Sequence, residues 1–202
     1  MVSVRLGLLA LLSEVPAGVY QLRKDFEART GGTWPLNIGQ VYTTIQRLDR
    51  DGLVELQGEQ DGVELYRLTD AGTAKLAQWW AGPVERGHPG RDELAIKIAL
   101  AVSAPNVDVA AVVQTQRTES MRALRDYTRL KARAGTADRD ELAWSLVLDN
   151  LIFATEAELR WLDHIEAAVV RAAAGRQDIT SDTKLPTERV DEPRTRRERS
   201  RR

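Results

Sequence analysis

The apolar residues of the N-terminal part recur at the three-to-four-residue spacing of helices, with breaks at proline and glycine. Residues 2–13 form a short apolar run, and residues 19–30 repeat apolar side chains on one face and charged side chains on the other. Pro16 and Gly18 separate the two stretches, because proline lacks an amide donor and glycine frees the backbone. The pattern therefore predicts two short helices joined by a break.

A third helical stretch begins at Asn37 and has two sides of very different polarity. Asn37 followed by Gln40 predicts a capping box at its start, and Asp51 with Gly52 predicts its end. At about 100° per residue, one side gathers apolar residues, namely Ile38, Val41, Ile45 and Leu48. The opposite side carries Gly39, Thr43, Gln46, Arg47 and Arg50, with Gln40 on the flank. Because a helix that only supports a core usually covers its outer face with Lys and Glu, this side is predicted to contact a ligand.

An alternating pattern follows the third helix and predicts a β-hairpin. Residues 53–57 and 63–68 are the expected strands, and Glu-Gln-Asp-Gly at residues 59–62 is the expected turn. Thr69 offers an N-cap for a fourth helix that runs to Trp80. The order helix, helix, helix, hairpin, helix is that of a winged helix-turn-helix, in which two helices brace the third and the hairpin is the wing. We therefore predict a mainly α fold with this N-terminal architecture.

A segment rich in glycine and proline, residues 82–91, predicts a linker between two domains. The winged-helix domain is expected over residues 1–81 and a helical domain over residues 92–174. Residues 175–202 lose the helical periodicity and predict a disordered basic tail. Such a tail either adds non-specific affinity for phosphate or is dispensable.

Three helices are expected in the second domain, over residues 92–102, 107–133 and 138–174. The last would be about 50 Å long, which is longer than a compact monomer of this size requires. Its apolar residues lie on more than one face: one side carries Leu142, Leu146, Phe153 and Trp161, and the rest carries Trp144, Leu148, Leu151, Leu159 and Leu162. Such a helix needs one partner within the chain and one outside it. We therefore predict a long-helix dimerisation domain and a homodimer.

Composition excludes several classes of protein. The chain of 202 residues has no cysteine, so disulfide frameworks, thiolate chemistry and cysteine-based zinc sites are excluded. His88 and His164 have no further ligand at metal-binding spacing. The sequence contains neither a nucleophile with an orienting base nor a glycine-rich phosphate loop. We expect no metal, no cofactor and no enzymatic activity.

Hydropathy and charge indicate the compartment but not the partner. The run from Leu6 to Leu12 is too short for a signal segment and has no cleavage site, and no other window approaches the ~18 apolar residues of a membrane span. We expect a cytoplasmic protein without a membrane partner. The formal net charge is −1 and the isoelectric point is about 6.2, so any contact with DNA must be local.

Several motifs occur together in the first hundred residues. They are LGLLALLSEVPAGVYQLRKDFE, the pattern N-x-G-x-V-Y-x-x-I-x-R-L-D-x-x-G-L-V after Trp34, the segment LYRLTDAG and, after the linker, the weaker DELAIKIALA. In this combination the sequence resembles the PadR family of bacterial transcriptional regulators. The remaining chain is similar in length and helicity to the longer C-terminal domain of one PadR subfamily.

The resemblance implies a dimeric transcriptional regulator, usually a repressor, whose third helix enters the major groove of a pseudo-palindromic operator. It also implies release by an effector, commonly a small aromatic or lipophilic molecule. The sequence departs from the family at two places. Thr43 stands where the family usually has Pro, and the wing from Gln57 to Glu64 is acidic where the family is rich in Arg and Lys. An acidic wing repels phosphate, so its tip is not expected to hold the DNA backbone tightly.

The expected partner of the third helix is double-stranded DNA. Thr43, Gln46 and Arg47 can hydrogen-bond base edges or phosphates, and Gly39 lets the backbone come close. Arg47 is the residue on which this prediction chiefly rests. The full set of predicted DNA contacts is Asn37, Gly39, Gln40, Tyr42, Thr43, Gln46, Arg47, Arg50, Tyr20 and Arg67. Simpler interpretations are a solvated face for the helix, packing for Tyr20 and Tyr42, and a surface charge for Arg67.

Trp79 and Trp80 are candidates for an effector site, because an indole stacks on a flat ligand; packing in a core or interface is the alternative. Two classes of function follow from the sequence. The first is a sequence-specific repressor. The second is a winged-helix protein-interaction module without DNA binding, which the acidic wing favours and the polar face of the third helix opposes.

Overall fold

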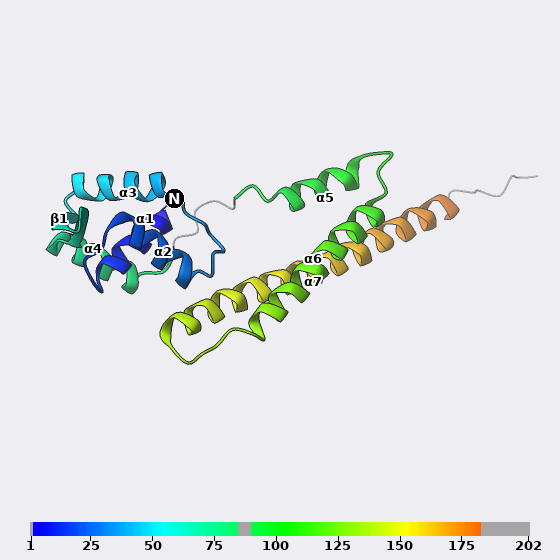
Figure 1. Cartoon of the computed structure of the whole chain (residues 1–202). Helices are drawn as coiled ribbons and strands as arrows, with labels where there is room; N and C mark the ends of the chain where they lie inside the picture. Colours follow the sequence, from blue (N-terminus) through cyan, green and yellow to red (C-terminus); the bar gives the residue numbers. More distant parts are fainter. Residues whose placement is uncertain (1, 85–89, 183–202) are drawn as a thin grey trace, which may run out of the picture.

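The computed structural model describes residues 2–84 and 90–182. Its N-terminal part gathers short helices and a hairpin, and two long helices lie side by side in its C-terminal part (Figure 1). The N-terminal elements are α1 (Val2–Leu12), α2 (Val19–Arg29), α3 (Ile38–Arg50), β1 (Val54–Gln60), β2 (Val63–Leu68) and α4 (Asp70–Ala81). The C-terminal elements are α5 (Glu93–Ser103), α6 (Val109–Lys131) and α7 (Arg139–Asp182). The predicted mainly α fold with a two-stranded wing is confirmed.

The N-terminal core buries the inner face of α3. Val41, Ile45 and Leu48 of α3 are fully buried. They belong to one cluster with apolar side chains of α1, α2 and both strands, among them Leu8, Leu9, Leu12, Leu22, Val54 and Tyr66. Removing a side chain of this size from water contributes about 1.5–3 kcal/mol, so α3 is held firmly by one face. Ile38, which the helical wheel places with the apolar side, is instead 46% exposed, as the first residue of the helix.

The wing is an antiparallel hairpin whose turn is tighter than the sequence pattern predicts. β2 occupies the predicted residues, whereas β1 extends beyond residue 57 to Gln60. The chain reverses at Asp61 and Gly62, whose φ angles are 52° and 77°, as a two-residue type I′ turn requires. A bulge between Leu56 and Gly58 shifts the register of the two strands.

The segment between α1 and α2 anchors the wing. Ala17 pairs with Tyr66 of β2, and the two residues exchange backbone hydrogen bonds of 3.1 Å. In the sequence this segment is recognisable only as a helix break, because a single bridge leaves no alternating pattern. As a result, Tyr66 has backbone neighbours on both edges, Leu56 in β1 and Ala17.

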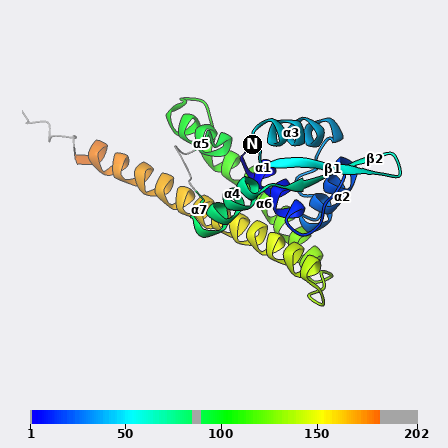
Figure 2. The ribbon, with the colours of Figure 1, turned by 90° about the vertical axis from the view of Figure 1, so that its left-hand side faces the viewer.

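α6 and α7 form an antiparallel hairpin of helices, with α5 packed on α6 (Figures 1 and 2). Ile98 of α5, Val113 of α6 and Ile165 of α7 belong to one buried apolar cluster. α7 continues to Asp182, so residues 175–182 are helical where the sequence predicts a disordered tail. The rest of that tail lies outside the described residues. None of the described helices has an apolar stretch of the length that a membrane span needs.

Polar pairs cross the hairpin of α6 and α7. Glu158 of α7 accepts hydrogen bonds from Ser120, at 2.5 Å, and from Gln116, at 2.9 Å. Nearer the connecting loop, Lys131 binds Asp149 at 2.6 Å. A shift of one helix along the other would leave these half-buried groups unpaired, at a cost of about 1–3 kcal/mol for each unsatisfied group. The pairs therefore fix the register of the two long helices.

The start of α7 contacts the end of α2 and joins the two parts of the chain. The Arg29 guanidinium binds both carboxylate oxygens of Glu14 at 2.6 Å and reaches Asp140 of α7 at 3.1 Å. The hydrogen bonds from Arg29 hold the pKa of the Glu14 carboxyl below its ordinary value. The indole of Trp144 packs against Gly31, whose φ is +56°. A side chain at residue 31 would overlap the indole, so this junction requires glycine.

Gly31→Ala and Gly32→Ala form a matched pair that measures this packing. Both glycines have positive φ, so alanine is strained at either position by about 1–2 kcal/mol. Only at Gly31 does the added Cβ also overlap Trp144, because the Cβ at Gly32 meets nothing within 4 Å. We expect Gly31→Ala to lower the free energy of unfolding by about 1–3 kcal/mol more than Gly32→Ala, measured by urea denaturation at one protein concentration. Equal losses would show that the indole does not press on Gly31.

Candidate nucleic-acid interface

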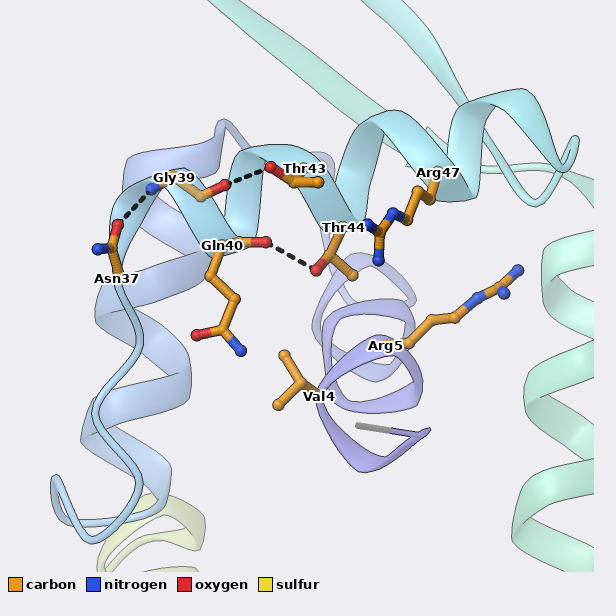
Figure 3. A pocket seen from close by; sticks show the side chains of 8 residues that line it. All are labelled: Val4, Arg5, Asn37, Gly39, Gln40, Thr43, Thr44 and Arg47. Carbon is orange, nitrogen blue, oxygen red and sulfur yellow. Dashed lines mark hydrogen bonds between the residues drawn. The ribbon is translucent and has the colours of Figure 1, made fainter.

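The outer side of α3 begins at a helix cap supplied by Asn37. The side-chain oxygen of Asn37 accepts a hydrogen bond of 2.7 Å from the amide of Gly39, which satisfies one of the free donors at the helix start. Asn37 is therefore the cap that the sequence predicts. Gln40, its predicted partner in a capping box, extends from α3 toward Val4 of α1 instead (Figure 3).

A groove of about 700 Å³ lies between α1 and α3 (Figure 3). Arg47 of α3 and Arg5 of α1 both border it. Arg5 is bound to Asp51 at 2.7 Å, whereas no carboxylate of the described residues lies within ion-pair distance of Arg47. Arg47 therefore keeps its donors for an external group. The groove is lined by Val4, Arg5, Asn37, Gly39, Gln40, Thr43, Thr44 and Arg47.

Two hydroxyl groups of α3 are turned back onto the helix. Thr43 donates to the carbonyl of Gly39 and Thr44 donates to the carbonyl of Gln40, each at 2.7 Å (Figure 3). The hydroxyl proton of Thr43 is thus used within the helix. In this rotamer Thr43 can accept a hydrogen bond from a ligand but cannot donate one.

Gln46 is connected to the wing through Tyr66 and Glu64, which are not among the predicted DNA contacts. The side-chain nitrogen of Gln46 donates to the Tyr66 hydroxyl at 3.4 Å, and that hydroxyl donates to Glu64 at 2.8 Å. Burial and the bond to Glu64 raise the pKa of Tyr66 to about 12. The signal that the sequence offers is the spacing of Glu64 and Tyr66, because side chains two residues apart lie on one face of a strand.

Two further arginines of the predicted set are already paired. Arg50 binds Asp51 at 3.2 Å and Arg67 binds Glu55 at 2.6 Å. Both pairs are at the surface, with the arginine side chains 73% and 55% exposed. Surface pairs contribute only about 0–1 kcal/mol, so either arginine can exchange its carboxylate for a phosphate.

The aromatic candidates lie outside the groove between α1 and α3. Tyr20 and Tyr42 are 65% and 52% exposed, which does not fit the packing interpretation for them. Trp79 of α4 packs against the N-terminal core, whereas Trp80 is 65% exposed. The two indole centroids are 4.3 Å apart. The structure thus gathers Asn37, Gly39, Gln40, Thr43 and Arg47 at one groove and leaves the two tryptophans apart from it on α4.

Comparison with known proteins assigns both parts of the chain. Residues 8–78 match the transcriptional regulator PadR-like family, and residues 90–169 match the family described as virulence activator alpha C-term. A probable transcriptional regulator of Mycobacterium tuberculosis is 28% identical over 183 residues, which cover 81% of this chain and 95% of that protein. The N-terminal part of the chain therefore matches the PadR-like family of transcriptional regulators, and the chain as a whole is similar to a probable transcriptional regulator over most of its length.

Solved structures of similar proteins share this fold. The negative transcriptional regulator PadR of Bacillus subtilis is 21% identical over 82% of this chain and 97% of that protein. Its structure in complex with operator DNA has a TM-score of 0.64, at 20% identity, over 82% of this chain and 98% of that chain. The same protein has been solved with p-coumaric acid. The Vibrio cholerae virulence activator AphA also gives a TM-score of 0.64, at 22% identity, over 84% of this chain and 99% of its own.

Substitutions of Asn37 separate helix capping from ligand contact. Aspartate caps a helix about as well as asparagine, whereas alanine lacks the acceptor. We expect Asn37→Ala to lower the free energy of unfolding by about 1 kcal/mol and Asn37→Asp to leave it nearly unchanged, measured by thermal unfolding. Because aspartate adds a negative charge beside the groove, we expect Asn37→Asp to weaken binding to duplex DNA. Unchanged DNA affinity in the aspartate variant would remove Asn37 from the contact surface.

Proposed function

We propose that the protein is a sequence-specific DNA-binding repressor that acts in the cytoplasm as a homodimer on a pseudo-palindromic operator. The observation that carries the proposal is the two-sided character of α3. Val41, Ile45 and Leu48 are buried on one side, and the other side presents Arg47 at an open groove. A helix braced in this way projects as a ridge that fits the major groove.

In this proposal, the polar groups of α3 contact different parts of the DNA. The Arg47 guanidinium matches either the two acceptors of a guanine edge or a phosphate. Gln46 offers an amide to a base edge, and the backbone at Gly39 allows close approach near the positive end of the helix dipole. The exposed hydroxyls of Tyr20 and Tyr42 supply further hydrogen bonds to phosphates at the margin of the contact.

The wing contributes little affinity in this proposal. Glu59, Asp61 and Glu64 are all exposed near its tip, and Arg67 is paired with Glu55. Acidic groups oppose the approach of phosphate. Because the wing neutralises few phosphates, the affinity for DNA should decrease less steeply as the salt concentration rises. Sequence recognition then depends mainly on α3.

Relatives support the proposed target and sign of regulation. Bacillus subtilis PadR is a negative regulator and has been solved with operator DNA. AphA is a virulence activator, so likeness to these proteins alone does not decide between repression and activation. We propose repression because of the likeness to PadR. If the protein fails to bind DNA, the alternative function is a winged-helix protein-interaction module.

The homodimer is supported by an apolar ridge along α7, which consists of Leu142, Leu146, Phe153 and Trp161. These four side chains are between 36% and 64% exposed, although the opposite side of α7 is buried against α6. Apolar residues at helical spacing are normally covered by a partner, and a second copy offers the same ridge under two-fold symmetry. We propose that residues 92–174 form this dimer and that the linker 82–91 joins them to the winged helix 1–81.

Release by a small aromatic or lipophilic effector completes the proposal. Bacillus subtilis PadR has been solved with p-coumaric acid, which contains one aromatic ring. In this chain the exposed Trp80, next to Trp79, offers a flat surface on which such a ring can stack. An effector releases DNA only if it binds one state of the dimer more tightly than the other. The favoured state must be the one whose two α3 helices do not match the spacing of the half-sites, and the other is the DNA-binding state.

Arg47→Ala tests the role of α3 in DNA binding. Fluorescence anisotropy with the duplex upstream of the protein's own gene, at two salt concentrations and with random duplex as competitor, gives the affinity. Because a bidentate contact to a base contributes about 1–3 kcal/mol, we expect the variant to bind about tenfold or more weakly than the parent. Arg122→Ala on α6, where the arginine is paired with Glu119 at the surface, is the matched control and should bind like the parent.

Either of two results would count against this proposal. An Arg47→Ala variant that binds the duplex as tightly as the parent contradicts the role given to Arg47. A parent protein that binds the upstream duplex no better than random duplex favours the protein-interaction module.

Phe153→Glu tests the dimer. A charge in the middle of the ridge would be buried without a partner on association, at a cost of several kcal/mol, so we expect the dissociation constant to rise about 100-fold or more. Sedimentation equilibrium of the parent and the variant measures the change. Thr115→Glu on an exposed position of α6 adds the same charge elsewhere and should leave the dimer intact. A parent that sediments as a monomer, or a Phe153→Glu variant that remains dimeric, would show that the ridge is not the interface.

A further inference from the structure

Three residues form a continuous hydrogen-bonded chain from α3 to the wing. Gln46 donates to the hydroxyl of Tyr66 at 3.4 Å, and Tyr66 donates to Glu64 at 2.8 Å. Tyr66 is only 4% exposed, whereas Gln46 and Glu64 are both exposed. A buried phenol therefore connects a side chain on the outer face of α3 with a carboxylate of the acidic wing.

The direction of each bond follows from the chemistry of Glu64. A carboxylate can only accept, so the single proton of the Tyr66 hydroxyl points to Glu64. The pKa of Tyr66, which burial and Glu64 raise to about 12, keeps that proton in place at neutral pH. The phenol oxygen then has only lone pairs for Gln46. Gln46 must therefore turn its NH₂ group, and not its carbonyl, toward Tyr66.

The position of the phenol is fixed by the fold. The backbone of Tyr66 is paired with Leu56 of β1 on one edge and with Ala17 on the other. Its ring belongs to the same buried cluster as Ile45 and Leu48 of α3. Because strand and helix are both attached to this cluster, the distance from the Tyr66 oxygen to α3 is set by packing. Tyr66 can hold the Gln46 amide in one orientation.

We propose that Glu64 and Tyr66 are positioning residues that set the base preference of Gln46, an inference that rests on the proposed DNA-binding function of α3. With one amide hydrogen directed at Tyr66, Gln46 presents its carbonyl oxygen and its second amide hydrogen outward. This pair of an acceptor and a donor matches the N6 donor and N7 acceptor of adenine in the major groove. The acidic residue in the wing then serves base selection and not phosphate binding.

The held amide is tested first without DNA, by NMR relaxation of the Gln46 side chain. In the parent, we expect the ¹⁵N order parameter of this amide to exceed that of a freely rotating surface glutamine. Tyr66→Phe should lower it to the free value. Tyr127→Phe, which removes a hydroxyl from α6, is the matched control and should leave it unchanged. A Gln46 amide that is already mobile in the parent would overturn the positioning role.

Base preference is then measured on duplexes selected from a random pool by the parent protein. We expect a preference for an A·T pair at one position of each half-site, which Gln46→Ala and Tyr66→Phe each reduce about tenfold without changing other positions. The double variant should lose no more than Gln46→Ala alone, because Tyr66 acts through Gln46. Glu64→Gln keeps a carbonyl acceptor for Tyr66 and should retain the preference, whereas Glu64→Ala should reduce it.

The outcomes separate this inference from the function on which it rests. A parent that selects no sequence overturns the DNA-binding function of α3 and the base-selecting role with it. A parent that selects a sequence, while Tyr66→Phe keeps the same preference at every position, overturns only the role of Tyr66. A lower folding stability of Tyr66→Phe cannot imitate the expected result, because the preference is a ratio of two affinities of one folded protein.

Discussion

Burial of one face of α3 is the constraint on which the rest of the N-terminal part depends. Val41, Ile45 and Leu48 lie fully inside a cluster contributed by α1, α2 and the wing, so the helix can neither rotate about its axis nor slide without exposing them. The outer face is thereby presented at a fixed angle. The groove between α1 and α3, the position of Arg47 at that groove and the hydrogen bond from Gln46 to Tyr66 all depend on that angle. Recognition of base edges needs such rigidity, because hydrogen bonds weaken steeply with misalignment.

The junction between α2 and α7 extends this constraint to the long helices. Arg29 bonds Glu14 and Asp140, and Trp144 packs on Gly31, so α7 is attached to α2, whose Leu22 shares a core with α3. In a dimer built on α7, the separation of the two α3 helices would depend on this junction. The ionic part of the junction is half-exposed and therefore weak, whereas the indole contact is steric.

The side-chain contacts show a structural role for the acidic wing. In the sequence it is a departure that opposes phosphate binding. In the fold, Glu64 accepts a hydrogen bond from the Tyr66 hydroxyl, and that hydroxyl accepts one from Gln46. The wing is also bonded to the segment between α1 and α2 through Ala17. The hairpin thus contacts α3 through Tyr66, which bonds to Gln46. The negative charge of Glu64 accepts the bond from Tyr66, a structural role that composition alone does not suggest.

The sequence by itself determined what short-range periodicity encodes. The order of helices and strands, the buried side of α3 at Val41, Ile45 and Leu48, and the presence of apolar residues on more than one face of α7 all follow from it. Which of those faces of α7 is buried, with Leu148, and which is exposed, with Phe153, is seen only in the structure. The sequence misjudged the burial of Ile38 and the ends of two elements, at Gln60 and Asp182, because residues at the ends of elements carry little hydrophobic signal. Only the tertiary structure decided which distant residues meet: Ala17 with Tyr66, Gln46 with Tyr66, and Gly31 with Trp144. These contacts arise from the packing of whole elements against one another, and no local pattern of residues specifies them.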